Sequence, residues 1–284
     1  MKLYLFTNEL SLRVLRDGKL PLLAVDALND PFLDSSIPLH EVQQIPISAT
    51  EFSNELRRQY EALPEDLRSI VSFEYFVQEA SQRRSDIETA MQGRRQTTPQ
   101  YLDKALRSKL AIGCFFQHIQ NPGIWEQQGA QHGGMALEID VELAQFKATT
   151  YDQHPQHFAE INYVDERPLT SDAPHESQML QRFRPLFQRP TVFQQQGEWR
   201  LVRPLAAAQK QGTNSVGQTL GFYKFPSSTV TGVVFGCYTS TQEIEHIAAA
   251  VTLDLRYRHV KLWQLQKDPV RYLFHKVPIA LERS

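Results

Sequence analysis

Short apolar runs recur along most of the chain, and glycine, proline or clusters of polar residues bound each of them. Runs of this length, rich in branched and aromatic side chains, are typical of buried β-strands. The expected strands lie at residues 2–6, 20–25, 110–116, 135–140, 159–164, the later part of 194–202, 221–225, 230–235, 260–265 and 272–277.

One long segment, residues 50–92, follows the helical spacing instead. Its apolar residues recur at intervals of three or four positions, as in Phe52, Leu56 and Tyr60. That spacing places them on one face of a helix, with the charged residues on the other face. We therefore expect consecutive amphipathic helices in this part of the chain.

Shorter helices are expected at residues 10–17, 99–109, 172–187 and 240–253. Thr7 or Asn8 can cap the first of them and Gly18 can end it, while Thr239 or Ser240 can cap the last.

Strands interrupted by one helical block predict an α+β protein. We expect a single domain over residues 1–284, with a mixed β-sheet core and a long helical insertion at about 50–109.

The stretch from 110 to 140 joins two apolar strand candidates through a polar loop. The loop contains Trp125, several side-chain amides and His132, and Gly133-Gly134 leads into the second strand. Rigid strands that flank a polar, glycine-containing loop often form the rim of a binding pocket. The alternatives are that Trp125 anchors the loop and that His132 is packed within it.

Composition narrows the class of protein. The chain has 284 residues, is 41% hydrophobic and 22% charged, and has a net charge of −2, which indicates a globular protein without a strong nucleic-acid signature. No apolar run is long enough to cross a membrane, and the N-terminus lacks the features of a signal peptide.

Cys114 and Cys237 lie in separate apolar runs and are expected to be reduced, as in a cytoplasmic protein. His154 and His157 have no evident third ligand, so no metal is expected.

The chemistry has to come from scattered polar residues, because no standard nucleotide-binding or hydrolase motif occurs. In a strand, Gln196, Glu198 and Arg200 share one face. Glu198 and Arg200 then form either a structural ion pair or a catalytic carboxylate held by its neighbours. Asp30 precedes Pro31 and is either a turn residue or a carboxylate that faces the pocket.

Four motifs together resemble the bacterial domain-of-unknown-function family 2971. They are Asn29-Asp30-Pro31-Phe32, Gly113-Cys114-Phe115, the Trp125…His132…Gly134 loop with its following strand, and Gln196-Gly197-Glu198-Trp199-Arg200. The resemblance implies an accessory or phage-defence protein of bacteria. The chain departs from the family at Gln127-Gln128, at Phe193 and at Gln196, where the family has a first glutamate.

A looser resemblance, to ADP-ribosyltransferases, rests on an early strand-helix-strand unit, a central strand pair and the Gln196-Gly197-Glu198 motif. It implies a split sheet, NAD as co-substrate and Glu198 as the carboxylate that stabilises an oxocarbenium-like state. Gln196 would position a small-molecule or macromolecular acceptor, and Arg200 would support Glu198.

The same resemblance implies where NAD would be bound. Donors at His132 and Gly133 would hold nicotinamide or phosphate, Tyr4 and Trp125 would line the cleft, and Asn29 and Asp30 would lie at its mouth. His132 and Glu198 would then approach one cavity.

Two other functions stay open. A metal-dependent nuclease or hydrolase would use Asp30, Glu138, Asp140 and Glu198. A non-enzymatic binding or sensor module would expose an apolar patch and lack a convergent polar cleft.

Overall fold

The computed structural model describes residues 1–284 except 29, 31, 34–44, 95–103, 166–182 and 281–284. The chain divides into two compact units, which are described separately. The first unit comprises Met1–Asp34, Leu102–Glu166 and Arg182–Ser284. The second comprises Ser35–Tyr101 and Arg167–Gln181.

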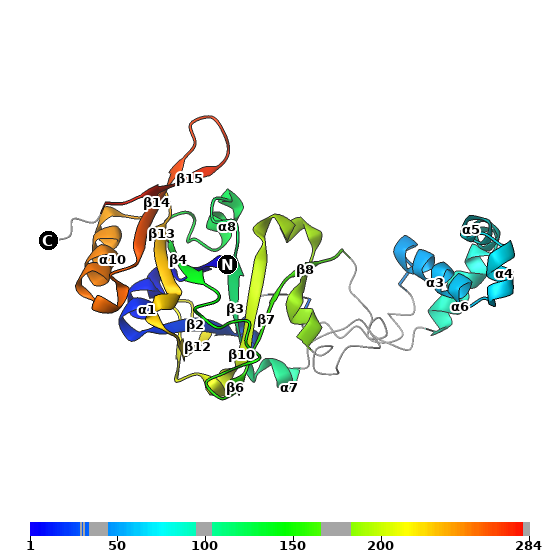
Figure 1. The fold of residues 1–284 in the computed structure, drawn as a ribbon, viewed down its shortest axis with the longest axis horizontal. Coiled ribbons are helices and arrows are strands. Elements are labelled where there is room, and N and C mark those ends of the chain that lie inside the picture. The colour runs from blue at the N-terminus through cyan, green and yellow to red at the C-terminus, as the bar shows by residue number, and fades with distance from the viewer. Residues whose placement is uncertain (29, 31, 34–44, 95–103, 166–182, 281–284) are drawn as a thin grey trace. The chain divides into compact units, whose positions relative to one another are not determined.

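The first unit is built on a large mixed sheet of 11 strands, which confirms the predicted α+β class with a mixed sheet (Figure 1). Its main path runs β11-β12-β2-β3-β1-β4-β13-β14-β15, while β10 pairs with both β3 and β7. The strands are β1 (Lys2–Phe6), β2 (Lys19–Ala24), β3 (Leu110–Phe116), β4 (Met135–Asp140), β7 (His157–Glu160), β10 (Glu198–Pro204), β11 (Lys210–Thr213), β12 (Thr219–Lys224), β13 (Val230–Phe235), β14 (Lys261–Lys267) and β15 (Phe274–Pro278).

Strand β3 is the point where the sheet divides. One edge of β3 pairs with β10 along its whole length. The other edge is shared, because β2 pairs with it at Ala111 and Ile112 and β1 pairs with it at Phe116. All pairings in this sheet are antiparallel apart from β13 with β14, which is parallel. The two ends of β3 therefore lead into two different halves of the sheet.

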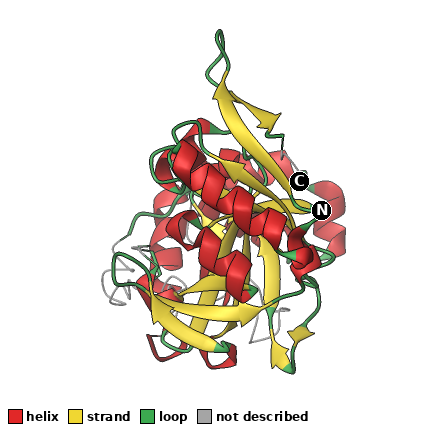
Figure 2. Cartoon of the chain, turned by 90° about the vertical axis from the view of Figure 1, so that its left-hand side faces the viewer, coloured by secondary structure: helices red, strands yellow, loops and turns green. Residues whose placement is uncertain are grey.

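Two helices cover one face of this sheet, α1 (Ser11–Asp17) and α10 (Thr241–Leu253) (Figure 2). Helix α1 ends at Gly18, whose φ of +61° suits a residue without a Cβ atom. Helix α10 begins with a capping box in which Ser240 and Glu243 bond each other's backbone N–H groups. Both helices pack into the main hydrophobic core, for example through Leu15 and Ile247.

Smaller apolar clusters lie on the opposite face of the sheet. One contains Ile112, Leu186 and Val202, and another contains Tyr4 and Trp125. This face carries the buried carboxylates discussed below.

The remaining short elements of the first unit connect the strands of the large sheet. They are α7 (Lys104–Arg107), α8 (Pro122–Gln127), the paired strands β5 (Thr150–Tyr151) and β6 (His154–Pro155), and the paired strands β8 (Asn162–Tyr163) and β9 (Gln188–Arg189). The β14–β15 hairpin projects from the sheet in both ribbon views (Figures 1 and 2).

The second unit is helical. Its described helices are α3 (Ala49–Glu61), α4 (Glu65–Ile70), α5 (Phe73–Gln82) and α6 (Arg84–Arg94). Ser48 and Glu51 form a capping box at the start of α3. Phe52 and Leu56 of the predicted apolar stripe are buried together, whereas Tyr60 is half-buried and contacts the ring of Phe73. Helix α7, at the end of the predicted insertion, belongs to the first unit.

Three local predictions need correction. Thr7 and Asn8 make no side-chain cap at the first helix, which follows a short 3-10 turn at Asn8–Leu10. The run 159–164 forms two short strands in different sheets. The C-terminal part of the helix predicted at 172–187 is a 3-10 turn, Arg184–Phe187, because Pro185 lacks the N–H donor of a continuing helix. The predicted helical segments 99–103 and 172–182 lie outside the described residues.

The described residues contain no helix with both the length and the apolar character needed to cross a membrane.

Candidate functional site

Gln196, Gly197 and Glu198 lie where a 3-10 turn meets the first residue of β10. The turn Thr191–Gln196 ends at Gly197, which has φ +56°. A Cβ atom at this position would come within 3.0 Å of the side chains of Gln117 and His118, so the close approach also favours glycine. Glu198 is thereby aimed into the protein at the first position of the strand.

Both carboxylate oxygens of Glu198 are held by arginines. Arg200 Nε donates to Oε1 at 2.6 Å, and Arg189 Nη1 donates to Oε2 at 2.5 Å. The Glu198 N–H donates to the Tyr163 hydroxyl at 2.8 Å. Arg189 and Tyr163 lie opposite each other in the β8–β9 pair, which places both beside Glu198. Glu198 is 1% exposed.

The electrostatics of this cluster keep Glu198 ionised. Burial opposes the charge, but the positive charges and hydrogen bonds of Arg200 and Arg189 outweigh it and lower the pKa of Glu198. The pKa of Arg200 is raised: burial opposes its charge, but Glu198 outweighs that effect. Burial and the charge of Glu198 raise the pKa of the Cys114 thiol to about 12. Cys114 therefore stays protonated and is no nucleophile near neutral pH.

Gln196 links this cluster to helix α8. Its Oε1 accepts a hydrogen bond from Arg189 Nη1 at 3.0 Å, and its Nε2 donates to Gln127 Oε1 at 3.0 Å. Arg189 also lies 3.9 Å over the ring of Phe193. Gln196 is therefore close to Glu198 through their shared contact with Arg189, although it precedes the strand.

A second buried carboxylate lies on the same face of the sheet. The registers align Glu198 with Phe116, Phe116 with Tyr4, and Tyr4 with Glu138. Residues directly opposite each other project from the same face, and three strand spacings of about 4.8 Å separate the two carboxylate positions by roughly 14 Å. The row places Phe116 and Tyr4 between two fixed negative charges.

Glu138 is surrounded by donors. Lys2 Nζ and Thr231 Oγ1 donate to Oε1 at 2.6 and 2.8 Å, Tyr4 donates to Oε2 at 3.1 Å, and Lys276 also donates to Oε2. Burial opposes the ionised form, but the hydrogen bonds from both lysines and Thr231 outweigh it and lower the pKa of Glu138 to about 2. Burial and the charge of Glu138 raise the pKa of the Tyr4 hydroxyl.

His132 lies in the turn between α8 and β4. Its φ is +69°, and its ring contacts Phe274 and Tyr238 edge to face. Its N–H donates to the carbonyl of Trp125 at 3.2 Å, while its buried Nδ1 has no partner among the described residues. The neighbouring Gly133 is half-buried and donates its N–H to Ala130.

No hydrogen bond or ring contact among the described residues joins His132 to the Glu198 cluster. That His132 and Glu198 approach one cavity therefore stays a prediction.

Trp125 and Asp30, two other residues predicted to line the pocket, have structural contacts of their own. Trp125 has no exposed surface and donates its Nε1–H to the carbonyl of Ile119 at 2.6 Å, so it anchors α8. Asp30 accepts a hydrogen bond from the Phe32 N–H at 3.0 Å, as its turn interpretation requires. Its carboxylate also contributes to the raised pKa of Arg200, so it lies within electrostatic reach of the cluster. Asn29 lies outside the described residues.

The described part of the chain contains no group of three or more histidine, cysteine, aspartate or glutamate side chains that could hold a metal ion. Asp140 accepts hydrogen bonds from the N–H groups of Glu142 and Leu143, whereas Glu138 and Glu198 are held by lysines and arginines. Asp140, Glu138 and Glu198, which a metal-dependent enzyme would use together, are therefore each bonded to different groups.

Sequence reasoning missed Arg189, Tyr163 and Lys276 as members of these clusters. Strands β8 and β9 are two residues long, too short to give a periodic signal. Arg189 stacks on Phe193 because the chain turns between β9 and the 3-10 turn Thr191–Gln196, so no regular spacing indicated the contact.

Comparison of the chain with protein-family models, with curated proteins and with solved structures finds no match. The resemblances drawn from the motifs accordingly stay expectations, and function has to be argued from the geometry of the Glu198 cluster.

Proposed function

We propose that the protein is a cytoplasmic enzyme that cleaves the nicotinamide–ribose bond of NAD or transfers ADP-ribose to an acceptor. The observation that carries this proposal is Glu198 itself, a carboxylate kept ionised by Arg189 and Arg200 at the start of a central strand. Breaking a glycosidic bond passes through an oxocarbenium-like state, and a fixed negative charge stabilises the positive charge that develops on the ribose.

Access to Glu198 depends on Arg189. The Arg189 side chain keeps 19% of its surface exposed, whereas that of Arg200 keeps 3%. Arg200 also donates to the carbonyl of Leu186 at 2.6 Å, which fixes it further. In the proposed reaction Arg189 releases Oε2 to a ribose hydroxyl, and Arg200 holds the carboxylate in place.

Gln196 is assigned to the acceptor, since it lies beside Glu198 and its amide contacts the exposed Gln127. The binding of nicotinamide and phosphate is assigned to His132, Gly133, Tyr4, Asn29 and Asp30. Trp125 supports α8 from within the core. In a bacterial cell this activity fits a phage-defence or toxin-type protein, as the family resemblance implies.

The test is NAD turnover by the purified chain, followed as nicotinamide release by chromatography. Glu198→Gln is expected to lower kcat by about 10²–10³-fold, because the amide carries no charge to stabilise the transition state. Glu160→Gln is the matched control, since Glu160 lies on the adjacent strand opposite Trp199 and is exposed. It should retain the wild-type rate.

Glu198→Gln leaves two arginines without their carboxylate, so its fold is checked by circular dichroism. Gln196→Ala is a second variant that leaves Glu198 intact. It should reduce transfer to an acceptor while NAD hydrolysis persists. An absence of NAD turnover and NAD binding by the wild-type chain, or full activity of folded Glu198→Gln, would refute the proposal.

A binding module is the second candidate, and the β14–β15 hairpin is the observation that favours it. At its tip Val270 is 86% exposed and Tyr272 is 102% exposed, as expected of side chains that contact a partner. A pull-down that loses its partner with Val270→Ser and Tyr272→Ser would support this candidate.

A further inference from the structure

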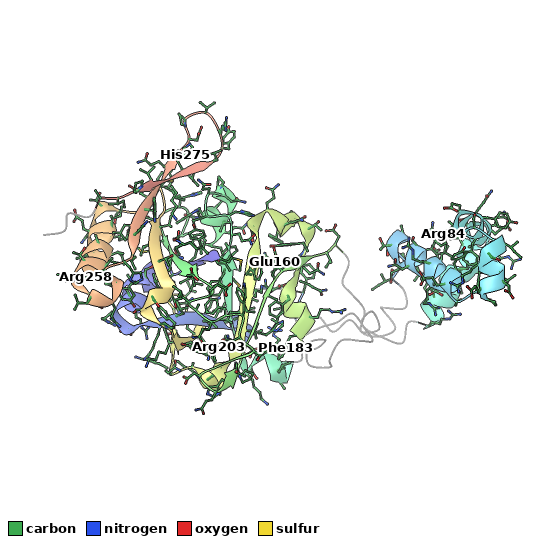
Figure 3. All side chains as sticks on the ribbon, in the orientation of Figure 1. Arg84, Glu160, Phe183, Arg203, Arg258 and His275 are labelled. Atoms are coloured by element: carbon green, nitrogen blue, oxygen red, sulfur yellow. The ribbon has the colours of Figure 1, made fainter. Side chains whose placement is uncertain are left out.

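Strand β10 carries another buried arginine on the face opposite Glu198. Successive residues of a strand project to opposite faces, so Arg203 lies on the other face from Glu198 and Arg200. Arg203 is 3% exposed. Figure 3 shows Arg203 near the lower end of the large sheet, with Glu160 farther along it. The guanidinium lies 4.7 Å from the ring centroid of Tyr223 and 5.0 Å from that of Tyr151.

Arg203 lacks the carboxylate partner that Arg200 has. Its Nη2 donates to the carbonyl of Tyr151 at 3.1 Å, whereas its buried Nε has no partner among the described residues. The carboxylate that acts on it is Asp152, which is exposed and bonded to Gln209 at 3.3 Å. Burial lowers the pKa of Arg203, and the opposing electrostatic effect of Asp152 offsets it only in part.

A buried guanidinium with unused N–H groups is costly unless an anion or another acceptor pairs with it. The stacked tyrosine rings offset part of that cost, but they accept no hydrogen bond in the plane of the guanidinium. Arg203 thus keeps its Nε–H without an acceptor among the described residues.

The Arg203 side chain lines part of a hollow. Its enclosed space is about 10 Å³, room for about one oxygen-sized atom, and the rest of the hollow is open to solvent. Its lining residues are mostly apolar or aromatic, with Arg203, Lys224 and Gln156 as the polar members: Leu20, Leu22, Ala144, Phe146, Tyr151, Gln156, Leu201, Arg203, Tyr223, Lys224 and Phe225.

The polar neighbours of Arg203 are fixed by other contacts. Gln156 Nε2 donates to three carbonyls, those of Gln145, Phe146 and Ala148. The Tyr223 hydroxyl donates to the carbonyl of Pro204 at 2.9 Å. Lys224 adds a positive charge at the exposed side of the hollow. The hollow therefore carries positive charge from Arg203 and Lys224, with Asp152 as the nearby opposing charge.

We propose that this hollow binds the oxyanion group of a small ligand, a carboxylate or a phosphate, through Arg203. A guanidinium N–H forms a strong, charge-assisted hydrogen bond to an oxygen of either group. Tyr151 and Tyr223 hold the guanidinium in place, so little side-chain freedom is lost on binding. The enclosed space takes one oxygen of such a group, and the remainder of the ligand lies at the open side next to Lys224.

The β5–β6 hairpin forms one wall of this site. It supplies Tyr151, and its two turn residues, Asp152 and Gln153, have φ values of 50° and 64°. These values are those of a tight hairpin turn, which fixes the position of the Tyr151 carbonyl that bonds Arg203. The oxyanion site is independent of the proposed NAD chemistry, because Arg203 and Glu198 lie on opposite faces of β10.

Thermal unfolding of the full chain tests the proposal. Melting temperatures are measured in sodium phosphate, sodium acetate and sodium chloride at equal ionic strength and pH. We expect phosphate or acetate to raise the melting temperature of the wild type by a few degrees over chloride. Phosphate alone would identify a phosphate-type ligand, and acetate alone a carboxylate.

Arg203→Met removes the guanidinium and should abolish the rise, whereas Lys210→Met, an exposed cation on β11, should retain it. Arg203→Lys keeps the charge without the planar donor set and should lose more than half of the rise. It serves as the test if Arg203→Met does not fold. General salting-out by phosphate would act equally on every variant. An equal rise in wild type and the Arg203 variants, or no rise in the wild type, would overturn the proposal.

Discussion

Arg200 and Arg203 show how one strand can bury two arginines with opposite consequences. Arg200 has Glu198 on one side and the carbonyl of Leu186 on the other. Arg203 has two tyrosine rings and one carbonyl. The first guanidinium belongs to an ion pair, and the second is buried without one.

Arg200→Met should lower the free energy of unfolding by about 3–5 kcal/mol, because breaking a buried pair leaves the remaining charge without its partner. Arg203→Met should be neutral or stabilising, since it replaces a buried, unpaired charge by an apolar side chain of similar length. Urea denaturation of both variants measures the difference.

Arg200→Met and Arg203→Met are each other's control, because both place methionine on β10 at a buried position. Equal losses of stability in the two variants would contradict this account of the Glu198 pair.

Glu138 should give stability a dependence on pH. Its pKa is about 2 in the folded protein, below the ordinary value of 4.5, so its contribution is complete above about pH 4.5 and is lost as the pH falls towards 2. Glu138→Gln should therefore be less stable than the wild type at pH 7, with a difference that shrinks as the pH falls from 5 to 2. Chemical denaturation at several pH values measures it.

The control is Glu160→Gln, which removes an exposed carboxylate that forms no ion pair among the described residues. Its difference from the wild type should stay small at every pH. A stability difference for Glu138→Gln that is constant from pH 7 to pH 3 would show that its hydrogen bonds, and not its charge, stabilise the protein.

At the scale of elements, local signals located the strands and several helix ends. Gly18 ends α1, and Ser240 caps α10, as their residue types and positions predicted. Both signals are local, because each residue acts on backbone groups within one helical turn. Trp125 lies within helix α8 rather than in a loop, since Asn121 caps that helix and Pro122 occupies its first turn.

In the Gln196–Arg200 segment, strand alternation correctly predicted the face of two of the three candidate residues but not the position of Gln196. Glu198 and Arg200 share a face, as the period of two predicted. Gln196 belongs to the preceding 3-10 turn, and Gly197 changes the direction of the chain. Gln196 nevertheless reaches the cluster because Arg189 bonds both it and Glu198.

At the scale of the whole molecule, the two units differ in how much apolar surface they bury. The core of the first unit extends over both faces of the large sheet. In the described part of the second unit the buried apolar cluster consists of Ile47, Phe52 and Leu56. Local stability follows buried contacts, so the two units should not unfold with equal free energies.

Hydrogen exchange followed by mass spectrometry tests this expectation on the intact chain. Amides in β3, β4 and β13 should exchange slowest, and those in α3, α5 and α6 should exchange faster, since fewer buried side chains oppose their opening. Helix α10 is the internal comparison: it is as long as α3, at 13 residues, and packs on the large sheet. Equal protection of α3 and α10 would contradict the prediction.

The sequence by itself determined the α+β class, most of the strands, the helical character of residues 50–92 and the shared face of Glu198 and Arg200. Each of these follows from periodicity or from residues within one turn of each other. The tertiary structure decided that Arg189 and Tyr163 meet Glu198, that Lys2 and Lys276 meet Glu138, and that Arg203 lies buried without a carboxylate. The physical reason is that strand order and register bring these residues together. Neither can be predicted from the spacing of residues along the chain.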